Sequence, residues 1–253
     1  MCKKNLKKTV APVWILSFLL LSGVTMWAQT TPEYRVPDKI LAIDGDGVGL
    51  QNALGNLYPI GWSRDGKFAF ARRSFVMYVG EQYTIVIQDL ITDRIVWYWE
   101  GEAGVALKDL WRENHDLFSE HLARFQIDPD EQGSFSSGDR FPYGGREYFF
   151  EVMPQFEERE FSDEGTSVTE SFIWASEVFA SSPQLGRKAI YVSPAVSGSR
   201  DVDAGVQGTI TSPFEDRAAV IYATVFLDIE LFKHTKFMLI GSHLTFGFQK
   251  NDD

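Results

Sequence analysis

Short runs of alternating apolar and polar residues, separated by tight turns, recur along most of this chain. The first pair of runs occupies residues 58–63 and 68–71, on either side of Asp65-Gly66. An Asp-Gly step between two β-type runs is a strong local signal for a hairpin. The pattern therefore predicts an antiparallel hairpin in this part of the chain.

A second pair of runs covers residues 84–90 and 94–99. The turn between them is shorter, and the pattern predicts another hairpin. By strict alternation Ile95, Trp97 and Trp99 should share one face of the last strand.

One segment has helical spacing. Residues 105–125 carry an apolar stripe, and Asp128-Pro129 should end the helix. The stripe consists of Leu107, Trp111, Phe118, Leu122 and Phe125. Residues 130–146 are rich in Gly, Ser and Asp and are expected to form a loop.

Strand patterns return in the second half of the chain. They cover residues 147–155, 167–179, 188–193, 204–211, 218–227 and 237–244. The sequence therefore predicts an α+β fold, mainly antiparallel sheet with one amphipathic helix. Residues 63–70 resemble residues 212–220 in pattern, and residues 87–92 loosely match residues 240–245. This suggests two related β-rich halves.

The N-terminus has the pattern of a signal peptide. Four lysines between residues 3 and 8 precede an apolar stretch over residues 10–24, which is shorter than the ~20 residues of a spanning helix. We expect cleavage after Ala28, a tether over residues 29–38, and a single domain over residues 39–253. The mature protein should be periplasmic or extracellular with no membrane span. An uncleaved membrane anchor is the alternative.

Charge limits the choice of partner. The chain has 24 Lys and Arg against 35 Asp and Glu, and its only cysteine, Cys2, would leave with the signal peptide. Strong acidity argues against nucleic acid and anionic lipid as partners, because both would be repelled. It is compatible with a cationic ligand, a basic protein or envelope component, or solubility alone.

Residues 61–97 resemble one blade of a TolB-like or WD40-like propeller. The likeness is carried by Trp62-Ser63-x-Asp65-Gly66-Lys67, by Val86-x-x-Asp89 and by Ile95-x-Trp97. It covers less than a fifth of the chain, and a propeller needs several blades to close. The resemblance therefore implies paired hairpins and not a propeller fold.

Other motifs favour structural interpretations. Residues 61–67 fit G-x-x-x-x-G-K, but Phe68 stands where a P-loop needs Ser or Thr, and no helix pattern follows. The loop with Asp44 and Asp46 is interpreted as an ordinary turn, with a Ca²⁺ site or a nucleotide loop as alternatives. The four histidines lack metal-ligand spacing, and we expect no cofactor and no metal site.

No nucleophile motif is present, so the sequence favours an exported, non-catalytic module that binds a macromolecule or serves a structural role. The alternative is an extracytoplasmic hydrolase with paired carboxylates, acting on a glycan. An acidic connector over residues 157–164 should project between two strands, where loops commonly carry recognition. Its candidate partner-binding residues are Phe156, Glu157, Glu158, Glu160 and Phe161.

Overall fold

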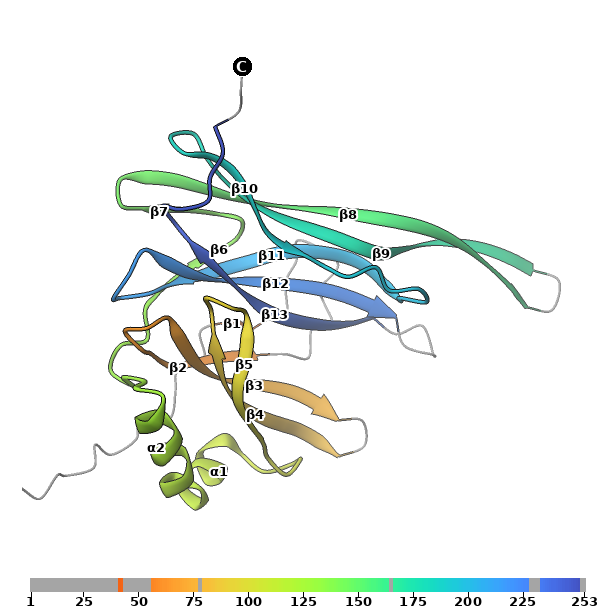
Figure 1. The fold of residues 1–253 in the computed structure, drawn as a ribbon. Coiled ribbons are helices and arrows are strands. Elements are labelled where there is room, and N and C mark those ends of the chain that lie inside the picture. The colour runs from red at the N-terminus through yellow and green to blue at the C-terminus, as the bar shows by residue number, and fades with distance from the viewer. Residues whose placement is uncertain (1–40, 43–55, 77–78, 164–165, 228–232, 251–253) are drawn as a thin grey trace, which may run out of the picture. The chain divides into compact units, whose positions relative to one another are not determined.

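A computed structural model of the chain describes residues 41–42, 56–76, 79–163, 166–227 and 233–250. All of them belong to one compact unit, Arg35–Asp253. They form two antiparallel sheets and two short helices (Figure 1). The mainly antiparallel fold predicted from the alternation is confirmed. The expected signal peptide, the expected tether and the loop with Asp44 and Asp46 lie outside the described residues.

The first sheet has five strands in sequence order. They are β1 (Leu41–Ala42), β2 (Asn56–Trp62), β3 (Lys67–Val76), β4 (Gly80–Asp89) and β5 (Arg94–Glu100). Both hairpins expected from the sequence are present, as β2–β3 and β4–β5. In the first turn Gly66 adopts φ +83°, a conformation that favours glycine.

A β-bulge in β5 changes one expectation. Ile87 pairs with Trp97 and Gln88 pairs with Ile95, so Val96 is an extra residue. The bulge reverses the alternation, and Ile95 does not share a face with Trp97 and Trp99. Ile95 is largely exposed, whereas the two tryptophans are half-buried against the helices.

The single helix predicted over residues 105–125 is in fact two helices, α1 (Leu107–Glu113) and α2 (His115–Arg124). Asn114 separates them, with backbone angles outside the helical range (φ −113°, ψ 19°) and its side-chain amide donating to the Leu110 carbonyl at 2.8 Å. The predicted apolar stripe nevertheless faces inward. Trp111 and Phe118 are buried, and the Phe118 ring lies 5.0 Å from Trp99 and 4.6 Å from Trp111, measured between centroids.

The second sheet contains eight strands, with the main path β13-β12-β11-β9-β8-β7. Its members are β6 (Ser134–Ser137), β7 (Arg140–Tyr143), β8 (Arg146–Asp163), β9 (Thr166–Ser182), β10 (Gly186–Val192), β11 (Asp201–Thr211), β12 (Arg217–Leu227) and β13 (Lys233–His243). The segment 130–146, expected as a loop, contains β6 and β7. These strands are only four residues long, which leaves little periodicity to detect.

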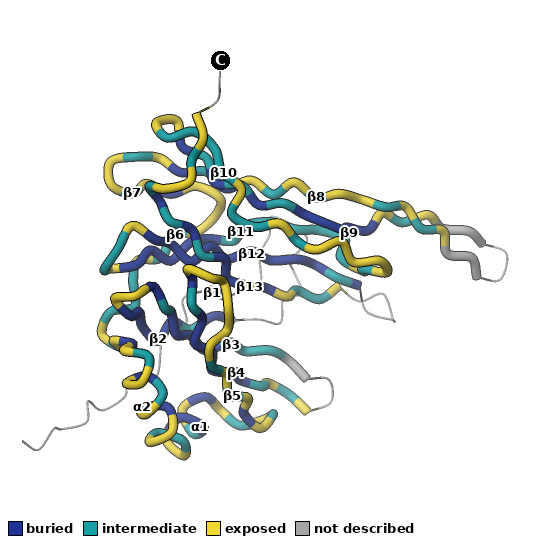
Figure 2. The backbone as a smooth tube through the Cα atoms, in the orientation of Figure 1, coloured by how far each residue is buried: buried dark blue, intermediate teal, exposed yellow. Residues whose placement is uncertain are grey.

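Strand β12 is buried along almost its whole length (Figure 2). One of its faces contributes Ile221 and Val225 to a core shared with the first sheet, which supplies Trp62, Phe68 and Phe70. The opposite face of β12 contributes to a second core with side chains of β7, β8 and β9. Because apolar layers cover both faces, β12 reads as a continuous apolar run and not as an alternation.

Polar bonds also connect the two sheets. The Gln88 side-chain amide donates to the Leu239 carbonyl at 2.8 Å. Arg217, which is buried and paired with Glu215, donates to the Leu90 carbonyl at 3.1 Å. Each bond joins a side chain of one sheet to a backbone carbonyl of the other, which helps to fix how the two sheets pack.

Strands β2–β4 and β11–β13 share a pattern of closing hydrogen bonds. In the turn after β2, the N–H of Ser63 donates to the Lys67 carbonyl at 2.9 Å; after β11, that of Ser212 donates to the Arg217 carbonyl at 2.8 Å. The residue that follows the third strand also bonds back to this turn. The Leu90 N–H, after β4, donates to the Gly66 carbonyl at 3.0 Å, and the Leu244 N–H, after β13, donates to the Asp216 carbonyl at 2.7 Å.

Candidate functional site

The candidate partner-binding residues lie on a long hairpin formed by β8 and β9. This hairpin extends past the ends of the other strands of its sheet (Figure 1). From the pair Glu157–Phe172 to the pair Asp163–Thr166, each of the two strands has only the other as a partner among the described strands. We call this ribbon, residues 157–163 and 166–172, the arm.

The structure corrects the expected connector. Residues 157–163 are the end of β8 itself, in register with β9. Acidic side chains occur on a strand here because one face of the ribbon is exposed to solvent and needs no apolar residues.

The alternation of β8 divides the five candidate residues. Phe156, Glu158 and Glu160 share one face and are exposed, with Phe156 exposed over 53% of its surface. Glu157 belongs to the opposite face, where it forms an ion pair with Arg159. The side chain of Phe161 lies outside the described residues. The structure therefore brings together three of the predicted residues and not all five.

Arg159 fixes the base of the arm. Its guanidinium donates to the Ser199 carbonyl at 2.7 Å and lies 5.0 Å from the centre of the Phe172 ring. Together with the Glu157 ion pair, these contacts hold Arg159 on the face that carries Glu157, which we call the inner face. Glu158 and Glu160 lie on the other, exposed face, which we call the outer face.

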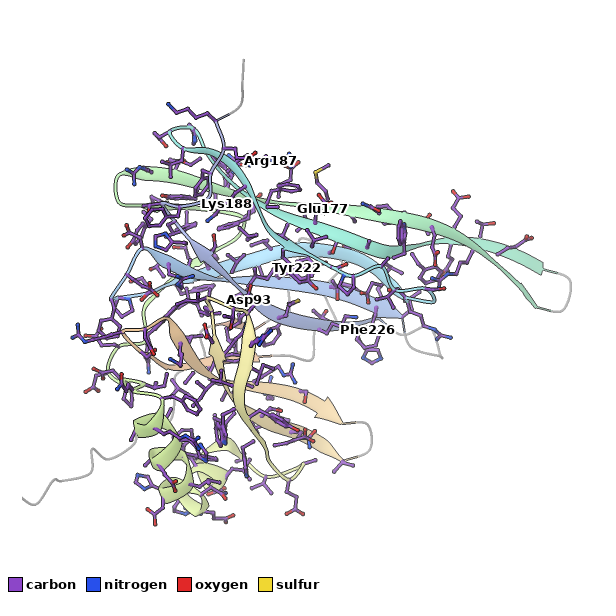
Figure 3. All side chains as sticks on the ribbon, viewed as in Figure 1. Asp93, Glu177, Arg187, Lys188, Tyr222 and Phe226 are labelled. Carbon is purple, nitrogen blue, oxygen red and sulfur yellow. The ribbon has the colours of Figure 1, made fainter. Side chains whose placement is uncertain are left out.

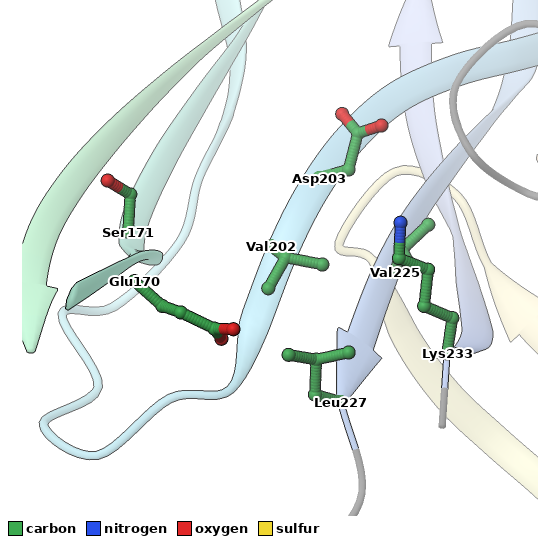
Figure 4. A pocket seen from close by; sticks show the side chains of 7 residues that line it. All are labelled: Glu170, Ser171, Val202, Asp203, Val225, Leu227 and Lys233. Carbon is green, nitrogen blue, oxygen red and sulfur yellow. The ribbon is translucent and has the colours of Figure 1, made fainter. Parts of the chain in front are cut away.

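A shallow pocket of about 340 Å³ lies beside the arm. The side chain of Glu170 extends from β9 toward Val202 and Leu227 (Figure 4). Asp203 also lines the pocket, and burial raises the pKa of its carboxyl although the Ala204 N–H donates to it at 2.8 Å. Two carboxylates thus line this pocket, together with Lys233.

Two further pockets, of about 340 and 310 Å³, meet at Arg72 of β3 and at Phe237 and Met238 of β13. The smaller one lies between the two sheets and is also lined by Asp93 and Glu100. Arg72 was not among the residues predicted from the sequence, because most of the residues around it are distant in the chain. The sequence does contain a signal: Arg72 continues the alternation of Phe68 and Phe70, which face inward from β3.

Asp93 links the β4–β5 turn to β13 (Figure 3). Although the residue as a whole is exposed, its carboxylate accepts a hydrogen bond from the Gly241 N–H at 2.6 Å. Burial raises the pKa of Asp93 to about 6 from the ordinary value of 3.8, against the opposing effects of that bond and of Arg217. The carboxyl is therefore harder to ionise in the folded protein than in the unfolded chain.

This raised pKa predicts a pH dependence of stability. Between the unfolded and folded pKa values the folded protein holds more protons than the unfolded chain, so the contribution of Asp93 to stability decreases as pH rises through about 6. Asp93→Asn keeps an oxygen acceptor for Gly241 but cannot ionise. In urea titrations from about pH 4 to 7, wild type should lose stability relative to this variant, while the exposed Glu102→Gln should follow wild type. Parallel curves for wild type and Asp93→Asn would refute this assignment.

The histidines each contact different neighbours. The His121 ring is stacked on Trp97 with centroids 4.4 Å apart, and the Nδ1 atom of His243 accepts a hydrogen bond from the Thr245 N–H at 3.3 Å. Within the described ranges, no group of three or more His, Cys, Asp or Glu side chains could hold a metal ion. No helix in that part of the chain is long and apolar enough to cross a membrane.

Comparison with protein-family models found no matching family, and comparisons with curated proteins and with solved structures found no match either.

Proposed function

We propose that this chain is an exported protein that binds a basic protein partner through the outer face of the arm. The observation that carries the proposal is that β8 and β9 continue as a two-stranded ribbon with exposed Phe156, Glu158 and Glu160. An isolated two-stranded hairpin is marginally stable in water, so a partner that packs on the arm would stabilise it. Export through residues 1–28 would place this surface in the periplasm or outside the cell.

Charge supports a basic partner. The chain has a formal net charge of −11, which disfavours nucleic acid and anionic lipid. The carboxylates of Glu158 and Glu160 would attract a basic partner, and the exposed Phe156 ring beside them would give it an apolar contact.

The charge of the arm can be tested against a matched change elsewhere. We expect the purified protein to recover a partner from envelope or secreted extract, with recovery falling several-fold as salt increases from about 0.05 to 0.5 M because screening weakens the attraction. Glu158→Gln with Glu160→Gln should reduce recovery, measured by quantitative mass spectrometry. Glu113→Gln with Glu120→Gln removes the same charge from exposed helix positions and should leave recovery unchanged.

Equal loss with both pairs of substitutions would mean that overall charge, and not the arm, drives capture of the partner.

The competing function is a carboxylate hydrolase, for which Asp93 and Glu100 in one pocket are the candidate acids. Glycosidase and esterase substrates should show no turnover above an unfolded control. Turnover that persists in the arm variants and disappears with Asp93→Asn would replace the binding proposal with the hydrolase.

We also propose that β2–β4 and β11–β13 derive from one duplicated three-strand unit. The support is that Ser63 and Ser212 make equivalent turn-closing hydrogen bonds, and that Leu90 and Leu244 do so as well. These residues lie where the two sequence patterns resemble each other.

A further inference from the structure

The larger of the two pockets that meet at Arg72, which we call the Arg72 pocket, has the composition of a small-ligand site. Its volume of about 340 Å³ falls within the range of natural ligand pockets. Strands β9, β10, β11, β12 and β13 line it, together with Arg72 from the other sheet. Its apolar wall includes Ile173, Trp174, Tyr191, Val196, Tyr222 and Met238.

Arg72 has one guanidinium donor without a hydrogen-bond partner among the described residues. The side chain is partly buried, and its Nε atom is enclosed without a hydrogen-bond partner within the described chain. Burial lowers the pKa of Arg72, opposed by the charge of Glu100. The Glu100 carboxylate itself accepts a hydrogen bond from the Gln82 side-chain amide at 2.9 Å. A buried guanidinium donor without a partner carries a desolvation cost, which an anionic ligand would remove.

A second unsatisfied group lines the same pocket. Thr224 is only 5% exposed, and its hydroxyl has no hydrogen-bond partner in the described structure. The hydroxyls of Ser176 and Tyr222, by contrast, bond to each other at 2.7 Å. Arg72 and Thr224 come from different sheets and line the same pocket.

The charges around the pocket favour an anion. Lys236 and Asp201 form an ion pair at 2.9 Å and offset each other. With Arg72 the lining carries two cations and one anion, a balance of +1 in a chain whose total is −11. The lining of the Arg72 pocket is therefore positive although the chain as a whole is negative.

We propose that the Arg72 pocket binds a small apolar carboxylate, with the carboxylate at Arg72 and Thr224 and the hydrocarbon against the aromatic wall. A guanidinium can bind a carboxylate through two parallel hydrogen bonds, which fixes the orientation of the ligand. The volume suits a medium-chain acid or an arylalkanoic acid and excludes a folded protein segment. This site is separate from the outer face of the arm.

Decanoate is a suitable probe, with decanol as its uncharged counterpart. Titration of the purified protein should change the tryptophan fluorescence, because Trp174 lines the pocket, and should raise the thermal midpoint. Decanol should bind about tenfold more weakly or worse, since it lacks the charge-assisted bonds. Absence of any decanoate binding at millimolar concentration, or equal binding of decanol, would overturn the proposal.

Variants separate a ligand site from a structural arginine. Arg72→Met should weaken decanoate binding by about tenfold or more while leaving the thermal midpoint of the free protein unchanged or higher, because it removes an enclosed Nε donor that has no hydrogen-bond partner in the described structure. Thr224→Val should weaken binding by a smaller factor. Arg73→Met is the matched control, since Arg73 is the next residue of β3 and pairs with Glu81 at 2.6 Å. Undiminished binding in Arg72→Met, or loss of binding in Arg73→Met, would refute the assignment.

Discussion

Replacing Phe118 by alanine should destabilise the protein by about 3–5 kcal/mol, the usual cost of removing a buried aromatic side chain. Phe118 is 1% exposed, and its ring contacts Trp97, Trp99 and Trp111 at centroid distances of 6.3, 5.0 and 4.6 Å. Phe118 and His121 are the side chains of α2 whose rings contact the tryptophans of β5. Loss of the Phe118 ring would leave a cavity that the three tryptophan rings cannot close without leaving their own contacts.

Chemical denaturation measures this difference directly. Leu117→Ala, at an exposed position on the same helix, is the control and should change stability by no more than about 0.5 kcal/mol. If Phe118→Ala were no more destabilising than Leu117→Ala, the assignment of the inward helix face would be wrong.

Replacing Gly241 by alanine should have an effect at or above the upper end of the overpacking range, about 3 kcal/mol. A Cβ at this position would overlap the Leu90 carbonyl oxygen and would lie 2.6 Å from its carbonyl carbon and 2.9 Å from its Cα. These are backbone atoms, so no side-chain rotation can relieve the overlap. Moving β13 away would also stretch the bond from the Gly241 N–H to Asp93.

A second substitution on the same strand tests this interpretation. Thr235→Ala removes atoms from a half-buried position of β13 and should cost less than about 1 kcal/mol. The thermal midpoint of Gly241→Ala should be many degrees lower than that of Thr235→Ala. Similar midpoints would show that the contact between Leu90 and Gly241 can relax, and that the two sheets are less tightly joined than the structure indicates.

The parts of the fold that depend on local pattern could be predicted from the sequence. The β2–β3 hairpin follows from Asp65-Gly66, and the inward faces of α1 and α2 follow from the spacing of Trp111 and Phe118. The break at Asn114 was not predictable in this way, because the apolar stripe keeps its spacing on both sides of it. The bulge at Val96 was missed for a similar reason: one extra residue reverses the alternation without altering composition.

The candidate site depended on information that a local pattern does not contain. The acidic run was identified, but its alternation along β8 turns Glu157 inward to Arg159 and leaves Glu158 and Glu160 outside. Arg72 and Thr224 are more than a hundred residues apart in the chain. Their place in one pocket follows from how the two sheets pack, which the sequence of either strand does not specify.

The arm differs from the rest of the molecule in how its length can evolve. From Glu157 to Asp163, β8 pairs only with β9, so residues can be added or removed there without changing the ladders of the two sheets. Removing one residue from each strand would exchange the inner and outer faces, whereas removing two from each would preserve them. Insertions and deletions that keep the acidic face should therefore occur in steps of four residues, and the reach of the arm can be selected separately from the stability of the core.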